Sequence, residues 1–193
     1  ETYPHTYNIK VQDTSQFQKP TITDVFSVDY TKEANVADFT NTNPINDFYT
    51  VNNGMLSIRK GISSKAPYWK DQSHGLYLYT GNEISVVVAG DAEITFAVCM
   101  YGKPYGILNE PDLPEGANGS FVSGENHMQS SACGNTITYH YTGPATTLRF
   151  VLASSDNTST GENYLHSTTV KNTGELTGST VVNPQEAMPN ERS

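Results

Sequence analysis

Between residues 75 and 101 the chain passes through three hydrophobic runs separated by two short turns. The runs are rich in aromatic and β-branched residues, which suit the pleated surface of a β-sheet. In the third run apolar residues recur at every second position, so that one face of a strand would be apolar. The runs, at 75–79, 84–89 and 93–101, therefore predict an antiparallel three-strand meander.

The same kind of run occurs elsewhere in the chain, again between residues that favour turns. These further runs cover residues 7–11, 22–30, 48–51, 55–60, 136–142, 146–154 and 163–170. Helix signals amount to a turn or two within residues 31–41. We therefore predict an all-β fold, an antiparallel, jelly-roll-like β-sandwich of about ten strands with little helix.

A length of 193 residues fits a single domain with tails. We expect an N-terminal lead-in over residues 1–20, a sandwich domain over 21–171, and a linker or added strand over 172–193. Residues 102–135 are rich in Gly, Pro, Asn and Ser and read as a long loop insert, and loops of that length are usually functional or disordered.

The formal net charge of −9 argues against nucleic acid as a partner, because binding to phosphates depends on Lys and Arg. The sequence has neither a basic run for an anionic membrane surface nor a long apolar stretch for a membrane span. Unesterified pectin is disfavoured on the same electrostatic grounds unless calcium bridges the charges. Neutral partners remain open.

Signatures of catalysis and of metal binding are scarce. The sequence has no G-x-S-x-G, H-E-x-x-H, Walker or Rossmann pattern. Glu110, Asp112 and Glu115 lie in the insert, where we expect a solvated loop; paired carboxylates for an enzyme, or ligands for a structural calcium, are the alternatives. The two cysteines, Cys99 and Cys133, are left open between a disulfide and buried thiols.

Aromatic residues in polar stretches suggest a binding site. The single tryptophan, Trp69, follows Tyr68 and precedes three polar residues. Rings on polar loops can stack on the C–H faces of sugars, and planar polar groups can bind sugar hydroxyls. Packing of Trp69 into the base of the sandwich is the alternative. The predicted ligand-binding residues are Trp69, Tyr68, Lys70, Asp71 and Gln72, with a second group formed by Tyr101, Lys103 and Tyr105.

Two segments, 74–102 and 139–170, resemble non-catalytic β-sandwich modules that are appended to bacterial polysaccharide-degrading enzymes and to starch-binding proteins of gut Firmicutes. The matching elements are His74-Gly75, VAGDA at 88–92, YTG at 141–143 and YLHS at 164–167. The resemblance covers roughly residues 22–170 and implies a scaffold in which His74 and His166 are framework residues. It implies neither a catalytic residue nor a particular sugar.

We therefore expect a non-enzymatic, monomeric module of a larger extracellular or cell-surface protein. It would bind a plant polysaccharide, with a neutral glycan such as a starch-type α-glucan or xylan favoured, and would need no cofactor apart from the possible structural calcium. The alternatives are a lyase or esterase, a pectin-binding module, and a protein-binding adhesion or scaffold domain. Exchange of Trp69 for alanine is expected to abolish binding and leave the fold intact.

Overall fold

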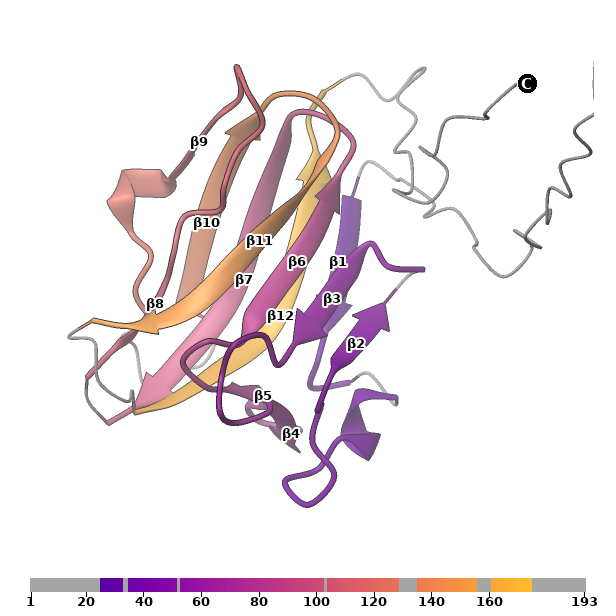
Figure 1. The fold of residues 1–193 in the computed structure, drawn as a ribbon, viewed down its shortest axis with the longest axis vertical. Coiled ribbons are helices and arrows are strands. Elements are labelled where there is room, and N and C mark those ends of the chain that lie inside the picture. The colour runs from indigo at the N-terminus through magenta and orange to yellow at the C-terminus, as the bar shows by residue number, and fades with distance from the viewer. Residues whose placement is uncertain are drawn as a thin grey trace, which may run out of the picture.

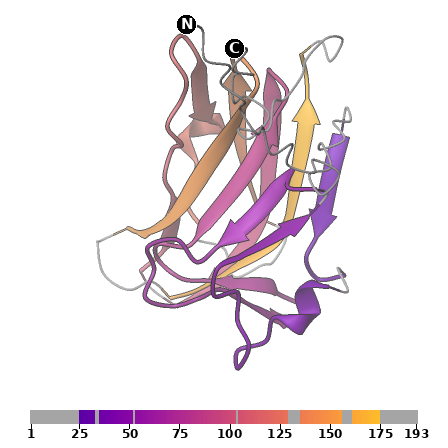
Figure 2. The same ribbon diagram turned by 45° about the vertical axis from the view of Figure 1, so that its right-hand side comes forward.

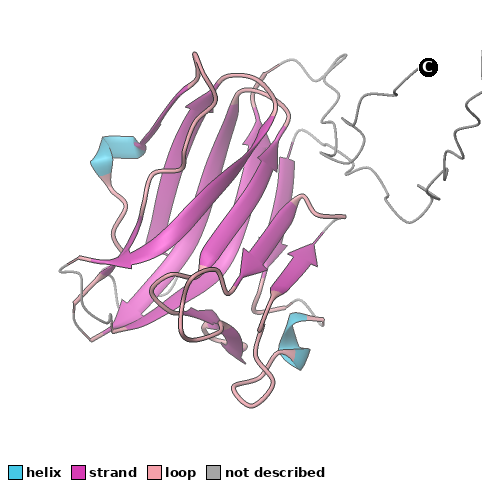
Figure 3. Ribbon diagram, viewed as in Figure 1, coloured by secondary structure: helices cyan, strands magenta, loops and turns pink. Residues whose placement is uncertain are grey.

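The described part of the chain forms twelve β-strands in two antiparallel sheets, an open β-sandwich (Figure 1). The computed structural model describes residues 25–32, 35–51, 53–102, 104–128, 135–155 and 161–174. Within these residues the only helical elements are two short 3-10 turns, η2 (Val36–Asp38) and η3 (Val122–Gly124) (Figure 3). The prediction of an all-β antiparallel sandwich is thus confirmed.

One sheet has seven strands, in the spatial order β4-β5-β12-β7-β10-β9, and β1 pairs with the far part of β12. The long β12 bridges the sheet, because one half of it pairs with β5 and the other half with β1. The strands are β1 (Val25–Asp29), β4 (Tyr68–Asp71), β5 (Gly75–Leu78), β7 (Ala92–Tyr101), β9 (Asn118–Phe121), β10 (Asn135–Thr142) and β12 (Glu162–Asn172).

The second sheet has five strands, in the order β2-β3-β6-β11-β8. It lies in front of the seven-stranded sheet in Figure 1. Its strands are β2 (Phe48–Val51), β3 (Leu56–Arg59), β6 (Glu83–Val88), β8 (Gly106–Leu108) and β11 (Thr146–Ser154).

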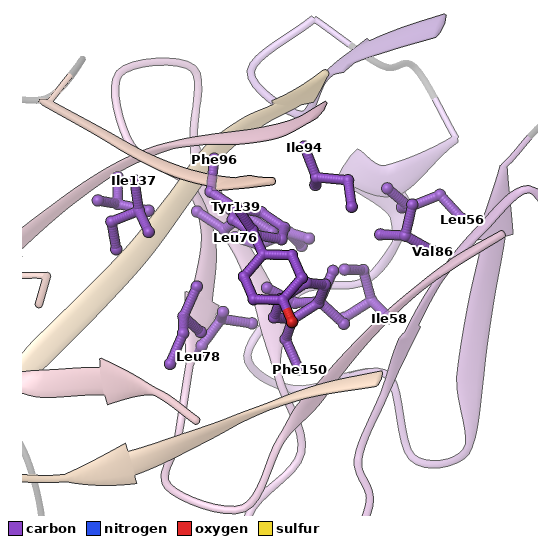
Figure 4. Packing of buried hydrophobic residues seen from close by; sticks show 14 of the residues in the cluster. Leu56, Ile58, Leu76, Leu78, Val86, Ile94, Phe96, Ile137, Tyr139 and Phe150 are labelled. Atoms are coloured by element: carbon purple, nitrogen blue, oxygen red, sulfur yellow. The ribbon is translucent and has the colours of Figure 1, made fainter. Parts of the chain in front are cut away.

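The core lies between the sheets and is built by alternation along the strands. In β7 the buried residues alternate with half-buried ones over most of the strand, as expected when one face packs on the core and the other faces outward. Phe96 of β7 meets Phe150 of β11 edge-on, with ring centroids 5.0 Å apart, so that aromatic contacts join the sheets (Figure 4). Tyr139 is also fully buried in this cluster.

The structure adds three strands that the sequence did not reveal, which are β4, β8 and β9. Two of them fall inside residues 102–135, so this segment is part of the sandwich rather than an appended loop: β8 pairs with β11, and β9 pairs with β10. The predicted run at 7–11 and the lead-in over 1–20 lie outside the described residues, as does the tail after residue 174.

Cys99 is fully buried in β7 and is disulfide-bonded. The sequence contains one other cysteine, Cys133, which lies outside the described residues. In the part of the chain that is described, none of the helices has the length and apolar character needed to cross a membrane.

The β4–β5 hairpin and η2 lie together at one end of the sandwich (Figure 2). The backbone N–H of Trp69 in β4 donates to the carbonyl oxygen of Phe39, just after η2, at 2.6 Å. Gly75 begins β5 with a φ of 81°, and a Cβ there would collide with the backbone of Leu165 in β12. A glycine at this position therefore lets β5 approach β12 closely.

Candidate functional site

A row of aromatic side chains crosses the outer face of the seven-stranded sheet at the β4–β5 end. Leu76 of β5 belongs to the core, so its neighbour Tyr77 points to the opposite face. Tyr77 is the register partner of both Tyr68 in β4 and Tyr164 in β12, and Tyr164 is in turn the partner of Cys99 in β7. Three tyrosines from three strands therefore lie side by side above the sheet.

Two more tyrosines extend this row into a cluster. Tyr77 lies 4.7 Å from Tyr79, between ring centroids, and meets Tyr164 edge-on at 5.2 Å. Tyr101, at the end of β7, also contacts Tyr164, at 6.0 Å. We call these five residues the tyrosine cluster: Tyr68, Tyr77, Tyr79, Tyr101 and Tyr164.

The tyrosine cluster has a buried base and an open rim. Tyr164 and Tyr68 form the base, being only 1% and 8% exposed. Tyr77 and Tyr79 are half-buried, and Tyr101 is 39% exposed. Rings at the rim thus have solvent-accessible surface and are held in place by the rings beneath them.

Polar groups surround the rim. The side chain of His74 packs against Tyr164 with ring centroids 4.7 Å apart, and its Nδ1 lies 2.7 Å from the Asp71 carboxylate. The ammonium group of Lys65 sits 5.2 Å from the centre of the Tyr79 ring, a cation–π contact. The Tyr164 hydroxyl donates to a carboxylate oxygen of Glu162 at 2.7 Å.

These surroundings keep the phenols of Tyr77 and Tyr164 neutral and the Asp71 carboxylate charged. Burial, followed by the nearby Tyr79 and Glu162, raises the pKa of Tyr77 to about 12. Burial and the hydrogen bond to Glu162 also raise the pKa of Tyr164. Burial alone would raise the pKa of Asp71, but hydrogen bonds from His74 and Ser73 outweigh it and lower that pKa.

Trp69 points away from the tyrosine cluster. It lies opposite Leu76 in the register, is half-buried, and packs against the hydrophobic core. Its indole N–H donates to the carbonyl oxygen of Tyr30 at 2.9 Å. These contacts are those of the packing alternative, and stacking of the remaining exposed ring surface on a ligand stays a prediction.

The residues predicted beside Trp69 have separate roles. Tyr68 is the buried base of the tyrosine cluster, whereas Lys70 and Gln72 are exposed at the hairpin. Asp71 closes the β4–β5 turn, because its Oδ1 accepts hydrogen bonds from the backbone N–H groups of Ser73 and His74, each at 2.8 Å.

The predicted second aromatic group is divided. Tyr101 belongs to the tyrosine cluster. Tyr105 precedes β8 of the other sheet, packs against the core, and stacks on His127 with ring centroids 6.0 Å apart. Lys103 lies outside the described residues.

The carboxylates of Glu110, Asp112 and Glu115 are exposed on the segment between β8 and β9, as expected for a solvated loop. No group of three or more His, Cys, Asp or Glu side chains with the geometry of a metal site occurs among the described residues.

Sequence reasoning missed Tyr164 and Glu162 as members of the site. Tyr77 and Tyr79 stand two positions apart, which places them on one face of a strand but does not say whether that face is packed or exposed. Tyr164 precedes the core residue Leu165, so alternation along the strand would likewise have placed the Tyr164 side chain on the outer face. The pairing of β12 with β5 was the missing information.

The chain matches no protein-family model, and a search of the curated proteins finds no significant sequence match.

Proposed function

We propose that this domain binds a neutral polysaccharide without cleaving it, through the rim of the tyrosine cluster. The observation that supports this most directly is the presence of partly exposed tyrosine rings beside Asp71 and His74. Pyranose rings have apolar C–H faces that stack on aromatic rings, and hydroxyl edges that need polar partners. The rim of the cluster provides both kinds of contact.

The base of the tyrosine cluster favours such a ligand energetically. Tyr79 and Tyr101 are positioned by contacts with Tyr77 and Tyr164, so little conformational entropy is lost when a sugar stacks on them. An open site of this kind gains only a few kcal/mol, so we expect a Kd on the order of 10–1000 μM.

Charge favours a neutral glycan over a uronate polymer. Among the residues that the structure places, two carboxylates, those of Asp71 and Glu162, lie at the cluster beside one contacting ammonium group, that of Lys65. The whole chain also carries a net charge of −9. A polymer with a carboxylate on every sugar would be repelled locally and overall.

The electrostatics support a binding role over a glycosidase-like one. A general acid needs a carboxyl group whose pKa is raised, whereas the pKa of Asp71 is lowered. Its oxygens are also occupied by the turn and by His74. The disulfide at Cys99 is consistent with the proposed extracellular or cell-surface setting as a module of a larger protein.

The test is electrophoresis in native gels cast with starch, xylan, β-glucan or pectin. We expect one neutral polymer to retard the wild-type domain. Tyr79→Ala and Tyr101→Ala are each expected to raise the apparent Kd, obtained from the retardation at several polymer concentrations, at least tenfold. Phe48→Ala is the matched control, because Phe48 is a 48% exposed aromatic residue on β2 of the other sheet. Far-UV circular dichroism would check that each variant is folded.

A pair of pectins tests the charge argument. Highly methyl-esterified and de-esterified pectin share a backbone but differ in charge. De-esterified pectin is expected to bind more weakly than its esterified form. The absence of retardation on every gel, or equal retention of wild type and both tyrosine variants, would refute carbohydrate binding at this site.

A further inference from the structure

A row of hydroxyl groups crosses the same outer face as the tyrosine cluster. Ser27 of β1 pairs in register with Thr169 of β12, Thr169 with Thr95 of β7, and Thr95 with Thr138 of β10. Four adjacent strands therefore place a hydroxyl side chain at the same level. At strand spacings of about 4.8 Å the row is roughly 14 Å long.

The burial pattern fixes the face on which the row lies. Val28, Val170, Ile94 and Ile137, the sequence neighbours of these four residues, are all in the core. The hydroxyl residues consequently point outward, where Ser27 is exposed and the three threonines are half-buried. We call Ser27, Thr169, Thr95 and Thr138 the hydroxyl row.

The hydroxyl groups are ordered relative to one another. The Ser27 and Thr169 oxygens lie 2.8 Å apart, and those of Thr95 and Thr138 lie 3.3 Å apart. A hydroxyl has one proton and two lone pairs, so each group in such a pair retains capacity for an external partner. The row is neutral and presents both donors and acceptors.

Two strands connect the hydroxyl row to the tyrosine cluster. On β7 the outward positions run from Cys99 beneath the cluster through Ala97 to Thr95, a distance of about 13 Å. On β12 they run from Tyr164 through Ser167 to Thr169. Ala97 and Ser167 are register partners. Because both side chains are small, no bulky group rises from the sheet between the tyrosine cluster and the hydroxyl row.

Charged groups lie beyond the row, on the side away from the tyrosine cluster. Glu93 is the register partner of both Lys171 and His140, and the His140 Nε2 lies 3.0 Å from its carboxylate. Glu93 and Lys171 thus place opposite charges side by side there. Between the cluster and the row the outward positions of β7 and β12 are uncharged, and Asp29 of β1, the register partner of Ser167, places a carboxylate at the side of this strip.

We propose that the hydroxyl row is a second subsite, which hydrogen-bonds the continuation of a chain that stacks on the tyrosine cluster. The ligand is then the interior of a long neutral polysaccharide, rather than a chain end or a short oligosaccharide. This inference rests on the proposed function.

The experiment compares short and long ligands by isothermal titration calorimetry, using soluble starch with maltotriose and soluble xylan with xylotriose. The double variant Thr95→Val/Thr169→Val removes two hydroxyls and keeps the shape and strand propensity of the side chains. With each lost hydrogen bond costing about fivefold in affinity, we expect a loss of at least fivefold for the polymer that binds and no change for its trisaccharide.

Three further variants make the result decisive. Thr147→Val makes the same change on the outer face of β11 in the other sheet and is expected to leave affinity unchanged. Thr95→Ser/Thr169→Ser keeps the hydroxyls and is expected to retain polymer binding. Tyr79→Ala tests the tyrosine cluster itself.

Unchanged polymer affinity in the double valine variant, combined with a loss in Tyr79→Ala, would overturn the second subsite and leave the proposed function intact. Unchanged affinity in Tyr79→Ala would overturn the proposed function and this inference with it. A trisaccharide that binds as tightly as the polymer would also overturn the inference, because the row would then add nothing.

Discussion

The rings of Tyr68 and Tyr77 stack across the register pair that joins β4 to β5, with centroids 5.2 Å apart and ring planes inclined by 16°. This contact holds the four-residue strand β4 at the edge of the seven-stranded sheet. It also supports Tyr77, on which Tyr79 rests. The stability of the hairpin and the geometry of the candidate site therefore depend on the same pair of rings.

Removal of the Tyr68 ring should destabilise the hairpin and disturb the geometry of the candidate site. Because Tyr68 is only 8% exposed, we expect Tyr68→Ala to lower the free energy of unfolding by about 3 kcal/mol. Tyr68→Phe keeps the stacked ring and should lower it by less than about 1 kcal/mol. Urea denaturation followed by circular dichroism measures both values, and equal losses would show that the hydroxyl rather than the stack carries the stability.

Trp69 provides a test of packing against ligand stacking. Trp69→Phe keeps a ring in the core but loses the hydrogen bond to Tyr30, and should lower the free energy of unfolding by about 1–2 kcal/mol. Trp69→Ala should lower it by about 2–4 kcal/mol, because the residue is half-buried. Urea denaturation again gives the numbers. An alanine variant of unchanged stability that no longer binds glycan would instead establish Trp69 as a stacking platform.

Alkaline pH should lower the free energy of unfolding at pH values below those at which the buried tyrosines of the folded domain ionise. The pKa values of Tyr77 and Tyr139 are raised to about 12, mainly by burial, whereas a tyrosine in the unfolded chain ionises near pH 10. Between these values the unfolded chain binds fewer protons than the folded one, so stability falls as pH rises. Below about pH 10 this contribution is fully present.

The measurement is the ultraviolet absorbance of tyrosinate during an alkaline titration, with the same protein in concentrated urea as the reference. We expect part of the native signal to appear only well above the reference midpoint or together with unfolding. Coincident titration curves for the native and unfolded protein would contradict the raised pKa values.

The sequence predicted strands where one face is buried, and missed them where pairing alone defines the strand. β7 and β11 show the two-residue alternation of a half-buried strand and were placed within a residue. β4 carries the polar sequence YWKD, and β9 carries NGSF. Neither has a local apolar pattern, and both become strands because β5 and β10 offer them backbone hydrogen bonds.

Only part of the candidate site was predicted, because strand pairing, which local sequence does not reveal, brings the rest of it together. Local sequence pointed to Tyr68 and Asp71, which are close along the chain, and to Tyr101. Tyr164 reaches the same surface only because residues 163–165 of β12 pair with residues 76–78 of β5. The direction of Trp69 was also beyond local reasoning, since it follows from the register that places it opposite Leu76.

A final prediction concerns the close approach of Gly119 in β9 to Tyr139 in β10. A Cβ at Gly119 would overlap the Tyr139 hydroxyl, and the ring cannot retreat because it is fully buried against Phe121 and Phe150. Gly119→Ala should therefore lower the free energy of unfolding by about 1–3 kcal/mol through overpacking. Gly90→Ala is the control, because the nearest atom to a Cβ there is 3.7 Å away.

The hydroxyl group is the nearest atom to the added Cβ, with two ring carbons behind it, so removing the hydroxyl should relieve part of the clash. The Tyr139 hydroxyl is buried and has no hydrogen-bond partner among the described residues, so Tyr139→Phe alone should change stability little. Combined with Gly119→Ala it should recover part of the loss, giving a coupling free energy of at least about 0.5 kcal/mol. Chemical denaturation of the wild type, both single variants and the double variant gives this value. Strictly additive losses would mean that the ring of Tyr139, rather than its hydroxyl group, limits the space at Gly119.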